Sequence, residues 1–163
     1  MRTLTMETRL PGLPEQFFPF FSDARNLSRI TPSELGFRIL TPGPIAMSAG
    51  TLIDYRIGLW GLPMRWRTRI ATWNPPRAFS DEQIRGPYKR WFHTHTFAPD
   101  GNGGTIMTDS VEFALPLEPL SLLVRPMVEW QVRRIFLFRD RALREALGLP
   151  TASPPPDIRI TTA

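Results

Sequence analysis

The chain has 163 residues, of which 42% are hydrophobic and 21% charged, a composition typical of a single globular domain. It contains no cysteine, which excludes disulfide bonds and thiolate metal sites and favours a cytoplasmic location. The formal net charge of +5 is compatible with nucleic acid or another anionic partner, but the basic residues are spread along the chain and do not form one cluster. We expect neither a signal peptide nor a membrane span, because no stretch is apolar over a sufficient length.

Alternating apolar and polar side chains over residues 4–10 predict a first strand that is buried on one face. Two short helices are expected after it, the first beginning at Pro14 and the second covering residues 24–29. Period-two patterns separated by turns rich in proline and glycine then predict six further strands. These strands cover approximately residues 35–39, 53–59, 64–70, 79–84, 91–97 and 107–115.

A long helix is expected over about residues 126–147, where apolar side chains such as Val132 and Phe136 recur at helical spacing. Gly148 stands where a helix-ending glycine is common. We place Arg133, Arg134, Arg141, Arg144 and Glu145 on the solvent side of this helix. The domain is expected to cover residues 1–149, and the proline-rich residues 150–163 are expected to form a flexible tail.

Strands joined by short turns indicate an antiparallel sheet in an α+β fold, with helices available to cover one of its faces. Local signatures agree with this order of elements. They are Pro14-Glu15, Asp23-Ala24-Arg25-Asn26-Leu27, Phe79-Ser80-Asp81-Glu82-Gln83, Trp91-Phe92-His93-Thr94-His95-Thr96-Phe97 and Gly104-Thr105-Ile106-Met107-Thr108-Asp109.

With these signatures, the chain resembles the START-like superfamily, also called SRPBCC or helix-grip proteins, from residue 3 to about residue 147. It is most similar to a bacterial ligand-binding branch with polyketide cyclase-like and cell-division-inhibitor-like relatives. The resemblance implies a curved seven-stranded antiparallel sheet around the long C-terminal helix. It also implies an apolar cavity between the two that binds a lipid, a polyketide or another hydrophobic molecule.

Both histidines of the chain lie in one predicted strand, two residues apart, so His93 and His95 share a face with Trp91 and Phe97. Two imidazoles on an otherwise aromatic face are costly unless each finds a hydrogen-bond partner. If the loop at residues 99–104 joins an antiparallel pair, Asp109 falls across the ladder from His93, within reach of a side-chain hydrogen bond.

Asp81 and Gln83 of the preceding strand are candidates to join this group, and three interpretations of it stay open. The group stiffens a cavity wall as a buried polar network, or it recognises a polar atom of an apolar ligand. In the third, the histidines and Asp109 act as acid–base groups in an enzyme. Two histidines and a carboxylate can hold iron or zinc, but this spacing is a weak signal, and we predict no metal and no cofactor.

Residues expected at inward positions of the strands and the long helix form the predicted ligand site. They are Tyr55, Trp66, Thr68, Asp81, Gln83, Trp91, His93, His95, Met107, Asp109, Val132 and Phe136.

The leading functional prediction is a binding protein for a hydrophobic small molecule. The alternative is a polyketide cyclase, aromatase or dehydratase type of enzyme that uses His93, His95 and Asp109. A third prediction is an interaction module that binds nucleic acid or a partner protein through a solvent-facing strand surface carrying Arg65, Arg67 and Arg69, although nucleic acid is the less expected partner. Neither the ligand nor the oligomeric state follows from the sequence.

Overall fold

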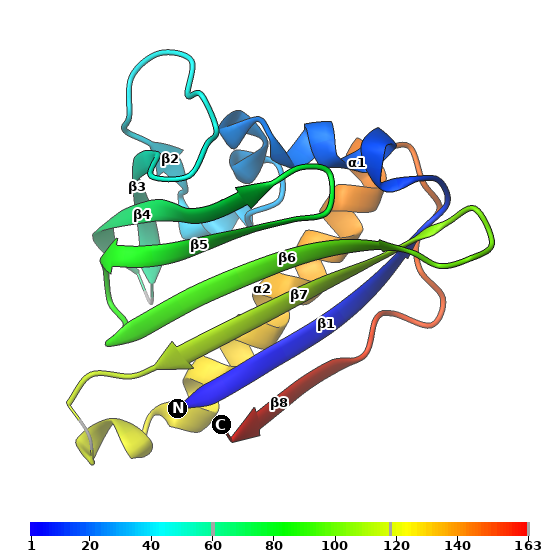
Figure 1. Cartoon of the computed structure of the whole chain (residues 1–163). Coiled ribbons are helices and arrows are strands. Elements are labelled where there is room, and N and C mark those ends of the chain that lie inside the picture. Colours follow the sequence, from blue (N-terminus) through cyan, green and yellow to red (C-terminus); the bar gives the residue numbers. More distant parts are fainter. Residues whose placement is uncertain (60, 118, 163) are drawn as a thin grey trace.

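A curved antiparallel sheet wraps around one long helix in the computed structural model, which describes residues 1–59, 61–117 and 119–162 (Figure 1). The described strands are β1 (Arg2–Leu10), β2 (Arg38–Ile39), β3 (Leu52–Leu59), β4 (Leu62–Asn74), β5 (Ala78–Arg85), β6 (Arg90–Pro99), β7 (Thr105–Ala114) and β8 (Ile158–Thr162). They form one sheet in the order β2-β3-β4-β5-β6-β7-β1-β8. The helix-grip fold predicted from the sequence is therefore confirmed.

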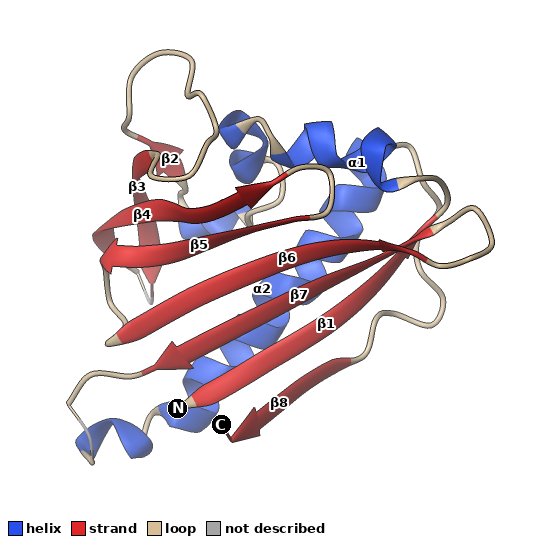
Figure 2. Cartoon of the chain, in the orientation of Figure 1, coloured by secondary structure: helices blue, strands red, loops and turns tan. Residues whose placement is uncertain are grey.

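The helices are α1 (Pro14–Phe21) and α2 (Arg125–Ala146), with short 3₁₀ turns η1 (Ala24–Ser28), η2 (Ser33–Leu35) and η3 (Leu120–Leu122). Figure 2 shows the strands as one layer, with α2 crossing behind it and α1 at one end. The side chains of α2 that face the sheet include Val128, Val132 and Phe136, spaced four residues apart as one face of a helix requires. They pack on β1 and β7 against residues such as Met6 and Val111.

Aromatic side chains of α1 close one end of the space between the sheet and α2. Phe18 meets the rings of Phe79 and Phe97 edge to face, with centroids 5.9 and 5.4 Å apart. Phe17 and Phe21 belong to the same buried cluster. This end of the fold is therefore packed core, and any open volume has to lie farther along the sheet.

The strand predicted over residues 35–39 is mostly absent. Ser33–Leu35 form η2, which ends at Gly36 in a left-handed conformation with φ 52°. Only Arg38 and Ile39 pair with β3. The apolar alternation that suggested a longer strand instead places Leu35 in the core from a turn.

The predicted flexible tail is wrong for residues 158–162, which form β8 and raise the number of strands from the predicted seven to eight. β8 pairs antiparallel with β1, and Figure 1 shows it at the edge of the sheet. Ile158 is buried there, while Arg159 points outward. The added strand covers backbone groups of β1 that would otherwise form an unpaired edge. Ala163 lies outside the described residues.

Arg144 does not lie on the solvent side of α2 as predicted, because it is only 9% exposed and pairs with buried Asp140. Its Nε donates to both carboxylate oxygens of Asp140 at 3.1 and 3.2 Å. Its Nη2 donates to the Arg9 carbonyl, and Thr8 donates to the Asp140 carboxylate at 3.2 Å. This group, called the Asp140–Arg144 pair below, ties α2 to β1.

Candidate functional site

A cavity of about 140 Å³ lies between the sheet and α2. Nine residues of the predicted ligand site line it: Tyr55, Trp66, Thr68, Asp81, Trp91, His93, His95, Val132 and Phe136. Most of the remaining wall is apolar and comes from residues that sequence reasoning did not single out, such as Phe21, Ile30 and Ile53. The cavity is thus an apolar space with a small number of polar groups, the usual composition of a small-molecule site.

Three residues of the predicted site lie outside the cavity lining. Met107 is buried in the core cluster around α1. The Gln83 amide holds a turn, donating to the Tyr88 carbonyl at 2.6 Å and accepting from the Tyr88 backbone nitrogen at 3.2 Å. Asp109 is fully buried behind the histidines.

Adjacent strands assemble the polar end of the cavity, called the histidine cluster below: Asp81, His93, His95 and Asp109. His93 lies opposite Asp81 of β5, and His95 lies opposite Asp109 of β7. The predicted proximity of Asp109 to His93 is therefore confirmed, and the residue directly opposite Asp109 is His95. Asp109 reaches His93 diagonally, and the His93 Nε2 to Asp109 Oδ1 distance is 2.9 Å.

One oxygen of Asp109 serves both imidazoles. The Nδ1 atom of His95 lies 2.8 Å from Oδ1 of Asp109, a close contact without full hydrogen-bond geometry. An ionised carboxylate can only accept hydrogen bonds, so each neutral imidazole places its proton on the nitrogen that faces Asp109. When both rings are neutral, the other ring nitrogens, Nδ1 of His93 and Nε2 of His95, carry lone pairs.

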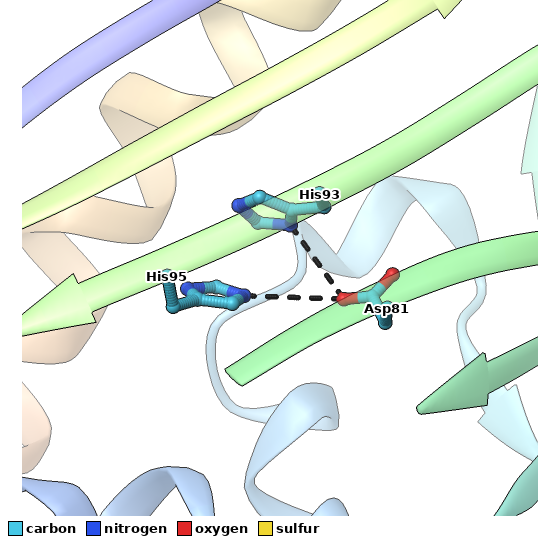
Figure 3. Close-up of side chains that lie close together, drawn as sticks. All are labelled: Asp81, His93 and His95. Atoms are coloured by element: carbon cyan, nitrogen blue, oxygen red, sulfur yellow. Dashed lines mark ion pairs between the residues drawn. The ribbon is translucent and has the colours of Figure 1, made fainter. Parts of the chain in front are cut away.

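Both of these nitrogens point toward Asp81 (Figure 3). Oδ1 of Asp81 lies 3.8 Å from Nδ1 of His93 and 3.9 Å from Nε2 of His95, distances too long for hydrogen bonds. The Asp81 side chain is 20% exposed and lines the cavity. The cluster thus has a buried side at Asp109 and an open side at Asp81.

Aromatic packing fixes the imidazole planes. The ring of His95 stacks on Phe79, with centroids 4.1 Å apart and an interplanar angle of 18°. The two imidazoles lie 3.8 Å apart, and His93 meets the ring of Phe136 on α2 at 5.4 Å. The nitrogens that face the cavity are therefore held in place before any ligand arrives.

Burial and the neighbouring charges set the ionisation of the cluster. Burial lowers the pKa of His95 to about 3, and repulsion from His93 adds to this effect, which Asp109 only partly offsets. Burial by itself would raise the pKa of Asp109, but attraction to the histidines and their hydrogen bonds hold it below its usual range. Burial raises the pKa of Asp81, against the attraction of His93 and Arg139. At neutral pH, His95 is neutral and Asp109 is ionised.

Arg139 is a charged cavity residue that sequence reasoning missed. It lines the cavity from α2, and its guanidinium lies over the Phe136 ring at 5.3 Å from the centroid. Its Nε is buried without a hydrogen-bond partner in the described part of the chain. The signal was its spacing, because Arg139 follows Phe136 by three residues and Val132 by seven, which places it on the inward face.

The outer face of the sheet carries the predicted exposed arginines. Arg65, Arg67 and Arg69 alternate with inward residues of β4 and are exposed, which confirms their predicted orientation. Arg67 pairs with Asp54 and Arg69 with Glu82. These carboxylates offset part of the positive charge on this face.

Residues 10–137 match the model of a protein family described as polyketide cyclase / dehydrase and lipid transport. The chain belongs to this family. Among the curated proteins, no sequence matches the chain significantly. Membership agrees with the START-like resemblance and with the position of the cavity between sheet and helix.

Solved structures similar to this family member share its fold at low sequence identity. The ZhuI aromatase/cyclase from Streptomyces sp. R1128 superposes with a TM-score of 0.69 at 14% identity, over 88% of this chain and 92% of that chain. Major latex-like protein 151 from Panax ginseng gives 0.61 at 17% identity, over 91% and 97%. A nucleoside-diphosphate sugar epimerase from Corynebacterium glutamicum gives 0.62 at 24% identity, over 88% of this chain and 29% of that chain.

The family match supports binding of a hydrophobic ligand or cyclase chemistry in general terms, and it names neither a substrate nor a catalytic residue for this chain. Within the described residues, none of the helices has the length and apolar character that a membrane crossing requires. The functional proposal therefore has to come from the geometry of the cavity.

Proposed function

We propose that the protein binds a hydrophobic small molecule in the cavity between the sheet and α2. The observation that carries this proposal is the cavity wall, in which aromatic and aliphatic side chains surround a few polar groups. Tyr55 and Trp66 stack at 5.8 Å on one side, and Val132 and Phe136 of α2 face the cavity from the other. We place this activity in the cytoplasm, because the chain has no cysteine.

The size of the cavity limits the part of a ligand that it can hold in this conformation. Its volume of about 140 Å³ is close to that of dry cavities of roughly 150 Å³ that take up a benzene-sized molecule. A single aromatic ring or a short acyl segment therefore fits directly, and a longer lipid or polyketide requires side chains to move. The histidine cluster and Arg139 favour a ligand with a hydroxyl, carbonyl or carboxylate group at one end.

A cyclase or dehydratase type of enzyme is the second candidate, because two imidazoles with lone pairs face an apolar cavity. A general acid or base works best when its pKa lies near the working pH, and the pKa of His95, lowered to about 3, is far from neutrality. Asp109 is fully buried and does not line the cavity, so it cannot meet a substrate directly. These two facts favour binding over acid–base catalysis.

Filling the cavity tests the proposal. Val132→Trp adds a large side chain at a buried position of α2 that faces the cavity, and overpacking of this kind costs about 1–3 kcal/mol of stability. We expect the folded variant to lose any small molecule that native mass spectrometry finds with the protein from its own host. We also expect it to enhance the fluorescence of ANS less than the native protein does; ANS is an aromatic sulfonate larger than a single ring, so the cavity side chains must move to admit it.

The matched control is Arg133→Trp, which adds the same side chain at the next residue of α2, at an exposed position. It is expected to keep both the co-purified molecule and the ANS signal. If the folded Val132→Trp protein binds ligand and probe as well as the control does, this cavity is not the binding site.

A further inference from the structure

Three potential metal ligands converge at the open side of the histidine cluster. One oxygen of Asp81 and one nitrogen from each of His93 and His95 all lie within 4.8 Å of one another. We propose that these three side chains bind a divalent transition-metal ion, of the class of zinc or iron(II), at the polar end of the cavity. This metal site goes beyond the proposed ligand binding, and it was not predicted from the sequence.

The spacing of the three atoms is close to what an ion needs. Oδ1 of Asp81 lies 3.8 Å from the His93 nitrogen and 3.9 Å from the His95 nitrogen. A point equidistant from three atoms so arranged lies roughly 2.5 Å from each, compared with ~2.0–2.2 Å for zinc bonds to imidazole nitrogen and carboxylate oxygen. Small side-chain movements would therefore complete the coordination.

The arrangement also places three acceptors face to face with no hydrogen bond between them. The two imidazole nitrogens carry lone pairs when their protons face Asp109, and a carboxylate oxygen has only lone pairs to offer. Acceptors that converge in a largely buried site repel one another unless a cation or a donor lies between them. A metal ion satisfies all three at once, and imidazole with carboxylate is a donor set that suits zinc and iron(II).

Asp109 supplies the outer support that metal-binding histidines usually have. Its Oδ1 lies 2.9 Å from Nε2 of His93 and 2.8 Å from Nδ1 of His95, on the sides of the rings away from Asp81. A carboxylate in this position fixes the tautomer and makes the facing nitrogen a stronger ligand. Here a single carboxylate would do this for both ligands.

The charges around the proposed metal site determine which further ligand the ion would bind. Asp81 and Asp109 together balance a divalent ion, and Arg139 adds one positive charge on the cavity wall. The remaining coordination positions face the cavity. An oxygen atom of a bound molecule, above all an anionic one, would suit both the ion and Arg139.

The experiment is titration of chelator-treated protein, freed of any affinity tag, with Zn²⁺ by calorimetry and with Co²⁺ by visible absorption. His93 and His95 are the only histidines and cysteine is absent, so imidazole coordination can come from no other residue. We expect one ion per chain, with a cobalt spectrum that shows nitrogen ligation. Asp81→Asn should weaken binding at least tenfold, and Asp109→Asn should weaken it about 10–100-fold through the outer sphere.

Asp54→Asn is the matched control, because it makes the same change at a carboxylate of β3 that pairs with Arg67. It should bind both ions as the native protein does. Absence of binding, or weak binding that is equal in the native protein and the Asp81→Asn variant, would overturn the site as adventitious. ANS binding, followed in metal-free samples so that its sulfonate cannot coordinate the ion, reports on the cavity separately, so loss of metal binding alone leaves the proposed function standing.

Discussion

Two groups of buried charges lie on the inner side of the sheet, and they are built differently. In the Asp140–Arg144 pair, Arg144 donates to both carboxylate oxygens and to backbone carbonyls, and Thr8 donates to Asp140. None of the side-chain polar atoms of Asp140 or Arg144 is buried without a partner in the described residues. The pair also lies outside the cavity lining. It is a closed network.

The histidine cluster is open by comparison. Oδ2 of Asp109 is buried without a partner among the described residues. On the cavity side, two imidazole nitrogens face Asp81 at 3.8 and 3.9 Å without a hydrogen bond. A closed network stabilises a fold, whereas polar atoms held unpaired at a cavity are available to a ligand or an ion. We therefore interpret the Asp140–Arg144 pair as structural, and we propose a functional role for the histidine cluster.

Breaking the closed network should give the largest effect. Arg144→Met leaves the Asp140 carboxylate buried without its cation and should cost about 3–5 kcal/mol of unfolding free energy. Urea denaturation followed by circular dichroism measures it. The double variant Arg144→Met with Asp140→Leu should recover most of this loss, since no charge remains buried. If it does not, the pair contributes more than mutual compensation.

Asp109→Asn should have the next largest effect, a loss of about 2 kcal/mol in unfolding free energy. The substitution keeps the shape but removes the negative charge that accepts a hydrogen bond from His93 and lies in close contact with His95, and hydrogen bonds to charged groups contribute roughly 1.5–3 kcal/mol. The same urea titration measures it. A loss below about 0.5 kcal/mol would show that the buried side of the cluster is no more closed than its cavity side, and would contradict the role given to Asp109.

The position of the histidines on one face of β6 could be predicted from the sequence, but their pairing across the sheet could not. Period-two alternation placed both histidines on the inner face of β6, and that much follows from the strand alone. The register did not follow, because it depends on the hairpin loop, where the Asp100 carboxylate accepts from the backbone nitrogens of Asn102 and Gly104. That loop pairs Pro99 with Thr105 and so sets Asp109 opposite His95.

The closed network was missed for a different reason. Positions 128, 132, 136, 140 and 144 form one line of residues four apart on α2, and the last two carry charges. Because Asp140 and Arg144 are charged, this end of α2 was predicted to face solvent. Their spacing of four residues from Phe136 instead continues the buried face of the helix. β8 was missed for a similar reason, because composition was given more importance than periodicity. Ile158 and Ile160 alternate with polar residues, but they follow a run of prolines that suggested a flexible tail.

The third-largest effect is expected in the pH dependence of the unfolding free energy, which should differ between the histidine cluster and the Asp140–Arg144 pair. The pKa of His95 is lowered to about 3 in the folded protein, so the unfolded chain binds more protons at this residue between about pH 6.5 and that value. Its stabilisation is therefore complete above pH 6.5 and decreases as the pH falls, by up to about 1.4 kcal/mol per pH unit. Urea denaturation at pH 7 and pH 5, with chelator present, measures the slope.

The control for this slope is His95→Gln, which removes the titrating group and should flatten the profile over that interval. Arg144→Met should shift the whole profile downward and leave the slope unchanged, because the closed network contains no histidine. An equal slope in the native protein and in His95→Gln would show that His95 is not the group responsible.

The smallest effect, and one of opposite sign, is expected at the open side of the cluster. Burial raises the pKa of Asp81, which means that the ionised carboxylate is less stable in the folded protein than in the unfolded chain at neutral pH. Asp81→Asn should therefore leave the metal-free protein as stable as before or stabilise it by up to about 1 kcal/mol, measured by urea denaturation at pH 7.

Asp54→Asn gives the reference for this measurement, because it removes the partner of Arg67 at the surface and should cost at most about 0.5 kcal/mol. If the Asp81 carboxylate makes the fold less stable, and if its replacement weakens metal binding, then this carboxylate is retained for binding and not for stability. If Asp81→Asn instead lost more than about 1 kcal/mol in metal-free protein, Asp81 would belong to a closed network like that of Asp140. The histidine cluster would then be a structural network like the Asp140–Arg144 pair and not a site for an ion.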